Sequence, residues 1–130
     1  MPKEWVVTEM GKPIKGIQDV LSISKQFEVS QTAAAIRLVQ LSEQPCAVIC
    51  SKDNRIMWGN TSKKFFSRVN KGLKLSKLTQ AYKLQKNVFA MKPVKTKSEY
   101  WFESKINGNL FEQSTLLYKD TALSLVWMKI

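Results

Sequence analysis

The predicted fold of this 130-residue chain is organised around the stretch from Pro45 to Phe66, PCAVICSKDNRIMWGNTSKKFF. Ala47 to Cys50 and Ile56 to Trp58 are short apolar runs, typical of neighbouring strands. Between them, Lys52-Asp53-Asn54 predicts a tight turn, because Asp and Asn side chains bond their own backbone and tolerate left-handed geometry. Gly59-Asn60-Thr61-Ser62 is expected to break the second strand and to cap a helix. The stretch therefore predicts a strand, a turn, a strand and a helix.

This order of elements resembles the start of a PAS or GAF-like sensor domain. The PAS pattern is a hairpin, a segment of the form grI-x-x-x-N and a short helix, and residues 54–60, NRIMWGN, fit it. The alternative is any other β-hairpin that precedes a helix. The resemblance implies that the sheet continues beyond a helical crossover.

The chain after residue 66 is expected to complete that sheet. A helix is expected near Ser76 to Gln85, with lysines on its outer face. Three further apolar or alternating runs predict strands, over residues 99–105, 110–118 and 122–130. Asn107-Gly108 is a strong hairpin-turn signal and Lys119-Asp120 is a weaker one. The expected fold class is α+β, with a five-stranded antiparallel sheet in the PAS/GAF order and helices between strands two and three.

A helix pair is expected before the sheet. Ile17 to Lys25 has the apolar spacing of a short amphipathic helix, and Thr32 to Leu41 has that of a second one. Ser30 is a candidate N-cap, because its hydroxyl can accept an otherwise unpaired backbone N–H. Gln44-Pro45 ends the second helix, since the residue before a proline is pushed out of the helical region. We do not expect a duplex-reading helix-turn-helix, because Arg37 is the lone cation on the second helix.

Residues 21–41, LSISKQFEVSQTAAAIRLVQL, carry a second resemblance. Their spacing resembles the segment L-a-x-x-F-x-V-S-x-x-A-a-x-x-R-L-x-x-L that follows the catalytic core in ImmA/IrrE-family metallopeptidases. The matching residues are Leu21, Phe27, Val29, Ser30, Ala33, Ala34, Arg37, Leu38 and Leu41. The resemblance implies a helical linker over residues 1–44 and a PAS/GAF-like sensor domain over residues 45–130.

Peptidases of that family need a zinc-binding His-Glu-x-x-His helix, and this chain has no histidine. The chain is therefore not expected to be an enzyme, and no metal ligand set or cofactor can be named on it. The resemblance implies a regulatory part of such a peptidase, whose catalytic domain would be a partner in cis or in trans.

Positive charge is concentrated in the middle of the chain. The formal net charge is +11, and residues 60–105 carry twelve Lys or Arg against only Glu99 and Glu103. A local excess of this kind attracts a polyanion, and nucleic acid is the usual one. Lysines outnumber arginines eleven to one in this region, which favours contacts with phosphate over reading of bases. The alternative is a lysine-rich face that only keeps the protein in solution.

Aromatic residues alternate with these cations, which is the pattern of a single-strand binding surface whose rings stack on bases. The candidate nucleic-acid-binding residues are Lys63, Lys64, Arg68, Lys71, Lys74, Lys77, Lys83, Lys86, Lys95, Lys97 and Trp101. Some ImmA/IrrE peptidases that pair with a repressor look to be switched on by single-stranded DNA. The resemblance therefore implies single-stranded DNA as the partner and control of repressor cleavage as the outcome. The alternative is that rings such as Phe65, Phe66 and Phe102 form core and only the lysines face solvent.

Cys46 and Cys50 are candidates for a switch or a redox role. On a strand, residues 46, 48 and 50 point the same way, so both thiols would face one side. Two sulfurs without a histidine are half of a zinc site, whereas one thiolate could reach a peptidase zinc and block it. The alternative is a pair of buried small hydrophobic residues.

Two other functions stay open: a small-molecule or thiol-redox sensor of PAS/GAF type, and an interaction module for an acidic protein partner. Phosphate binding weakens steeply with salt and pocket binding hardly does, so salt dependence would separate nucleic-acid binding from the small-molecule or redox sensor. No apolar run is long enough to span a membrane, and the N-terminus lacks a secretory signal. Two cysteines without a disulfide framework suit a reducing cytoplasm.

Overall fold

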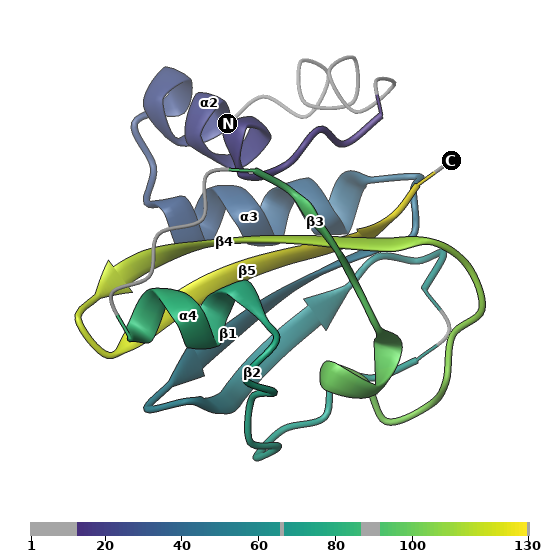
Figure 1. The fold of residues 1–130 in the computed structure, drawn as a ribbon. Coiled ribbons are helices and arrows are strands. Elements are labelled where there is room, and N and C mark those ends of the chain that lie inside the picture. The colour runs from purple at the N-terminus through teal and green to yellow at the C-terminus, as the bar shows by residue number, and fades with distance from the viewer. Residues whose placement is uncertain (1–12, 66, 87–91, 130) are drawn as a thin grey trace.

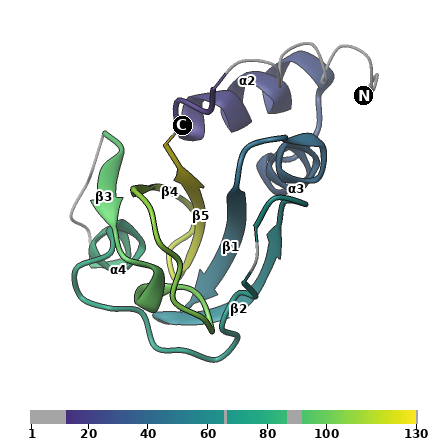
Figure 2. The ribbon, with the colours of Figure 1, turned by 90° about the vertical axis from the view of Figure 1, so that its right-hand side faces the viewer.

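The fold has three layers, in which a five-stranded sheet lies between a helix pair and a set of short elements and loops (Figure 1). The computed structural model describes residues 13–65, 67–86 and 92–129. Along the chain the elements are α2 (Ile17–Phe27), α3 (Gln31–Leu41), β1 (Cys46–Lys52), β2 (Arg55–Thr61), α4 (Gln80–Gln85), β3 (Val94–Thr96), a 3₁₀ helix (Ser98–Tyr100), β4 (Leu110–Tyr118) and β5 (Thr121–Met128). Figure 2 shows α3 and α4 on opposite sides of the sheet.

The strand order is β2-β1-β5-β4-β3, and every neighbouring pair is antiparallel. A first hairpin, β1–β2, is joined through α4 to a closing meander of β3, β4 and β5. This arrangement confirms the expected α+β fold, with an N-terminal helix pair, a five-stranded antiparallel sheet and a helix between strands two and three. None of the helices in the described part of the chain is long and apolar enough to cross a membrane.

Local turn and cap signals place several elements where the sequence predicts them. Asp53 and Asn54 both adopt positive φ, 50° and 63°, in the turn between β1 and β2. The side chain of Ser30 accepts a hydrogen bond from the backbone N–H of Ala33 at 3.0 Å and caps α3. Lys119-Asp120 joins β4 to β5, and the backbone N–H of Asp53 donates to the carbonyl of Asp120 at 2.9 Å.

The predicted strand break at Gly59-Asn60 is wrong, because β2 continues through Gly59 to Thr61. The helix expected after it is also wrong for the described residues, since residues 62–65 form a turn. Gly59 lies in the strand for a steric reason. A Cβ atom at this position would lie only 2.5 Å from a methyl carbon of Val69, so the glycine permits a close approach and does not break the strand.

The predicted strand over residues 99–105 is also wrong, since the third strand is Val94–Thr96 and a 3₁₀ helix follows it. Trp101 and Phe102 are consecutive and both are buried in the same cluster. A strand would send these two side chains to opposite faces, so the backbone turns there. Asn107-Gly108 therefore lies within a long connection to β4 and not in a two-residue hairpin.

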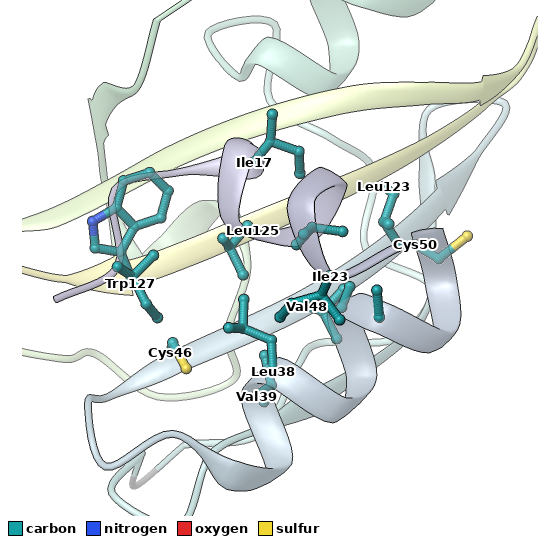
Figure 3. Packing of buried hydrophobic residues seen from close by; sticks show 14 residues of the cluster. Ile17, Ile23, Leu38, Val39, Cys46, Val48, Cys50, Leu123, Leu125 and Trp127 are labelled. Carbon is teal, nitrogen blue, oxygen red and sulfur yellow. The ribbon is translucent and has the colours of Figure 1, made fainter. Parts of the chain in front are cut away.

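Alternating residues of β1 and β5 supply two separate hydrophobic clusters, one on each face of the sheet. On the helix side, Leu38 and Val39 of α3 pack with Val48, Leu125 and Trp127 (Figure 3). On the other side, the alternate residues of these strands pack against the elements that follow β2. The members there are Ala47, Ile49, Ile56, Phe65, Val69, Leu75, Ala81, Trp101, Phe102, Leu110, Ala122 and Val126.

Two buried glutamines bond the start of the helix pair to the sheet. The amide oxygen of Gln44 accepts the backbone N–H of Ile14 at 2.9 Å, and its amide nitrogen donates to the carbonyl of Met128 at 2.7 Å. The amide oxygen of Gln113 in β4 accepts the backbone N–H of Ile17 at 2.9 Å. The helices of the expected 1–44 segment and the strands of the expected 45–130 segment thus share one core and several hydrogen bonds.

Candidate nucleic-acid interface

The two layers that cover the sheet differ sharply in charge. The helix layer, residues 13–44, carries three Lys or Arg and three Asp or Glu. The basic layer, residues 62–109, carries twelve Lys or Arg and two Glu, a net charge of +10. All twelve cationic side chains of the basic layer are exposed: Lys63, Lys64, Arg68, Lys71, Lys74, Lys77, Lys83, Lys86, Lys92, Lys95, Lys97 and Lys105. The sequence-based set omitted Lys92 and Lys105.

The predicted cations fall into three groups on the basic layer. The first, Lys63 to Lys74, lies in the segment that follows β2, the second, Lys77 to Lys86, lies at α4, and the third, Lys95 and Lys97, lies at and after β3. Within the second group, the ammonium of Lys86 lies 5.7 Å from the centre of the Tyr82 ring.

The segment after β2 is held against the edge of that strand. The backbone N–H of Ile56 donates to the carbonyl of Leu73 at 2.9 Å, and the N–H of Gly72 donates to the carbonyl of Ile56 at 2.7 Å. The N–H of Leu75 donates to the carbonyl of Asn54 at 2.8 Å. These bonds cover part of an exposed sheet edge and give the backbone on either side of Leu73 a defined position.

A second pairing joins residues 67–70 to residues 101–104. Val69 and Phe102 form an isolated antiparallel bridge, and both side chains are buried. The backbone N–H of Glu103 donates to the carbonyl of Arg68 at 2.9 Å, and the N–H of Ser104 donates to the hydroxyl of Ser67 at 3.0 Å. Arg68 and Glu103 are both exposed and are directly opposed next to this bridge, so they face outward beside each other.

Three surface cavities, of about 520, 440 and 560 Å³, adjoin one another along this pairing, since the first two share Arg68 and the last two share Ser104; we call them together the groove. The groove runs from Lys71 and Arg68 at one end to Lys97 and Lys105 at the other. Glu103 lines all three cavities. The tertiary structure thus brings cations from two distant parts of the chain to one polar groove, whereas the group at α4 lies outside it.

The stacking role predicted for Trp101 is wrong. Its side chain has 0% exposure, and the indole N–H donates to the hydroxyl of Thr96 at 2.9 Å. Phe65 and Phe102 are buried as a ring pair with centroids 4.5 Å apart, which confirms the alternative that they belong to the core. Phe66 lies outside the described residues. Among those described, Tyr82 and Tyr100 are the half-buried rings of the basic layer.

The structure confirms that Cys46 and Cys50 point to the same side of β1, into the core against the helix layer (Figure 3). Burial raises the pKa of both thiols above the ordinary value, which disfavours the thiolate that redox chemistry and metal binding need. Four residues of extended strand separate them by about 13 Å, so they do not pair with each other. No group of three or more metal-ligating side chains occurs among the described residues.

One buried carboxyl in the basic layer's half of the core was missed from the sequence. Glu112 of β4 is 1% exposed, and its Oε1 accepts the backbone N–H of Gln80 at 2.5 Å. Burial raises the pKa of Glu112, and the hydrogen bond from Gln80 and the positive charge of Lys83 offset this rise only in part. The only sequence signal was a charged residue on a strand face shared with the apolar Leu110.

The chain matches no protein-family model and no curated protein. Most residues that carry the resemblance to ImmA/IrrE peptidases have a structural role in the helix pair. Ser30 caps α3, Ala34 and Leu38 are fully buried, and Phe27 and Val29 pack against the same core. Packing of two short helices on a sheet therefore accounts for much of that spacing. The face of α3 that carries Ala34 and Leu38 is buried in the core, so α3 is a packing helix and not a free recognition helix.

Proposed function

We propose that this chain is a non-catalytic regulatory domain that binds single-stranded nucleic acid, specifically DNA, through its basic layer. The observation that carries the proposal is the segregation of charge, with +10 on one layer and a neutral layer on the opposite face. A surface of this kind binds a polyanion because neutralised phosphates release their counterions.

A single strand suits this surface better than a duplex. Duplex readers place a helix or a two-stranded ribbon in the major groove, but α4 has six residues and buries Ala81 and Leu84. Four cations on irregular segments, Arg68, Lys71, Lys97 and Lys105, line a polar groove, and a flexible strand can follow such a path. With Trp101 buried, binding relies on phosphate contacts more than on stacking.

The regulatory part of the proposal rests on the resemblance of residues 21–41 to ImmA/IrrE peptidases. In this scheme, strand binding on the basic layer shifts the sheet against α2 and α3. That shift would control repressor cleavage by a metallopeptidase domain, in cis or in trans, in the cytoplasm. Burial and the raised pKa of both thiols give no support to the alternative of a thiol-redox sensor.

The test is fluorescence anisotropy with a labelled single strand of about 20 nucleotides, at two salt concentrations. We expect binding that weakens steeply with salt, prefers the single strand to a duplex competitor, and resists poly-L-glutamate, which stands in for an acidic protein partner. Changing Lys63, Lys64 and Arg68 to Glu should lower the affinity about 100-fold and reduce the slope of log K against log salt by about 2.

A matched control reverses three cations of the helix layer, Lys15, Lys25 and Arg37, to Glu. This variant has the same total charge as the first one, so an effect of net charge alone would weaken binding in both. We expect the control to retain most of the affinity. Absence of binding at low salt, preference for the duplex, or equal losses in the two variants would refute the proposal.

A further inference from the structure

One feature of the groove opposes simple phosphate binding: a carboxylate at its centre. Glu103 is one of only two acidic residues in the basic layer and the residue common to all three cavities. A negative charge there repels phosphate and weakens attraction by Arg68 and the lysines. A groove that only held a phosphate backbone would be better served by a neutral residue at this position.

The backbone around Glu103 is held firmly. Its own N–H is bonded to the carbonyl of Arg68, and the next residue is bonded to Ser67. The preceding residue, Phe102, is 3% exposed and packs against the ring of Phe65, to which its own ring is tilted by 43°. Directly opposed residues of an antiparallel pair have Cβ atoms about 5 Å apart, so Glu103 and Arg68 present an acceptor and a donor set side by side.

An ionised carboxylate only accepts hydrogen bonds, through two parallel oxygens. Among the four bases, guanine alone offers two adjacent donors on its Watson–Crick edge, N1–H and N2–H. Adenine and cytosine present one amino group beside an acceptor nitrogen, and thymine presents one N–H between two carbonyl oxygens that a carboxylate repels. A single strand leaves this edge free, whereas a duplex hides it.

We infer that the groove contains a guanine subsite. In this subsite the Glu103 carboxylate accepts hydrogen bonds from guanine N1–H and N2–H, while Arg68 and Lys71 bind the phosphates next to that nucleotide. The inference rests on the proposed binding of single strands and adds a base preference to it. The guanidinium of Arg68 supplies donors in a planar fork that suits a phosphate.

The test compares a strand of about 20 thymidines with strands of equal length that carry two central guanines, adenines, cytosines or inosines. We expect roughly tenfold tighter binding of the guanine strand than of the thymidine strand, as for one good bidentate base contact. Inosine lacks the N2 amine, so the affinity of the inosine strand should lie between those of the guanine and thymidine strands. Adenine and cytosine should give little gain.

The decisive variant is Glu103→Gln, with Glu99→Gln as its matched control, because Glu99 lines only the cavity at the Lys97 and Lys105 end of the groove. Both changes remove one negative charge from the basic layer, so both should strengthen binding of the thymidine strand slightly. Only Glu103→Gln should abolish the guanine preference. Urea unfolding of both variants checks that any change arises in a folded protein.

The outcomes distinguish failure of the guanine subsite from failure of the proposed single-strand binding. If the thymidine strand does not bind, the proposed function fails. If it binds with no guanine preference, or if Glu103→Gln keeps that preference, the guanine subsite alone is refuted. Competition with guanosine monophosphate identifies the source of the base, because a free nucleotide that competes as well as the guanine strand makes the mononucleotide the ligand of the same subsite.

Discussion

On one face of the sheet, α2 and α3 bury aliphatic side chains such as Val20, Leu38 and Val39 completely, and their surface carries no net charge. On the other face, a six-residue helix, a 3₁₀ turn and irregular segments bury Trp101 and Phe102 and carry a net charge of +10. Both layers therefore supply half of the hydrophobic core. Only one of them combines that task with an array of exposed cations.

This difference indicates that the helix layer mainly stabilises the fold, whereas the basic layer also positions charged side chains. Regular helices bury a continuous apolar face without long-range backbone bonds, which suits a layer whose main task is stability. Short irregular segments instead depend on specific pairings, such as that of residues 67–70 with 101–104. Those pairings place individual side chains, Arg68 and Glu103 among them, at fixed points around a groove.

The largest expected effect comes from a cavity in the helix layer. Leu38→Ala should lower the free energy of unfolding by about 3 kcal/mol, because the removed side chain is fully buried between α3 and the sheet. Urea unfolding followed by circular dichroism measures this loss, with the exposed Gln40→Ala as control. Nucleic-acid affinity of the folded variant should stay unchanged. An affinity loss as large as that caused by changing Lys63, Lys64 and Arg68 to Glu would contradict the different roles of the two layers.

A smaller effect is expected from the buried ring of the basic layer. Trp101→Phe removes the indole N–H bond to Thr96 and leaves a gap, so it should cost about 2 kcal/mol of stability. Anisotropy of the labelled strand should not change, since Trp101 offers no exposed face to a base. Tyr118→Phe, at a ring that is 73% exposed, serves as control. Lost affinity with intact stability would restore Trp101 as a stacking residue.

The smallest effect concerns Glu112, whose pKa is raised by burial in the folded state. Between its ordinary value of 4.5 and the raised folded value, the unfolded chain loses this proton while the folded chain keeps it. Stability should therefore fall as pH rises through that window and stay lower above it. Glu112→Gln should remove this dependence and be more stable than the parent at neutral pH by on the order of 1 kcal/mol.

Urea unfolding at a series of pH values measures the effect, and the exposed Glu99→Gln controls for loss of a charge elsewhere in the basic layer. If the stability of the parent and of Glu112→Gln changes with pH in parallel, Glu112 does not titrate in that window.

Elements that depend on neighbours in the chain were predictable. The Asp53-Asn54 turn, the Ser30 cap and the span of β4 all follow from residue types within a few positions. The errors occur where distant residues meet. Glycine occupies strand position 59 because Val69 packs onto it, and the chain turns at Trp101 because two consecutive rings enter one core.

Prediction of the candidate site from sequence fails for the same reason, namely that distant residues meet there. Ten of the eleven candidate binding residues are cations, and all ten are exposed because burying an unpaired ammonium or guanidinium is costly. The eleventh, Trp101, is a candidate for its ring, and ring exposure depends on what packs around it. Lys105 at the groove and Glu103 at its centre were not singled out, since nothing local distinguishes them from other exposed charges.

Local sequence suffices to predict the helix pair, the turns at Asp53-Asn54 and Lys119-Asp120, the alternation of the long strands and the concentration of positive charge in the middle third. These features depend on backbone preferences, side-chain period and composition, which act over a few residues. The pairing of residues 101–104 with residues 67–70, which puts a carboxylate beside Arg68 in a basic groove, depends instead on contacts between distant residues. Burial of Val69 and Phe102 in a common core selects this pairing, and burial is a property of the whole fold.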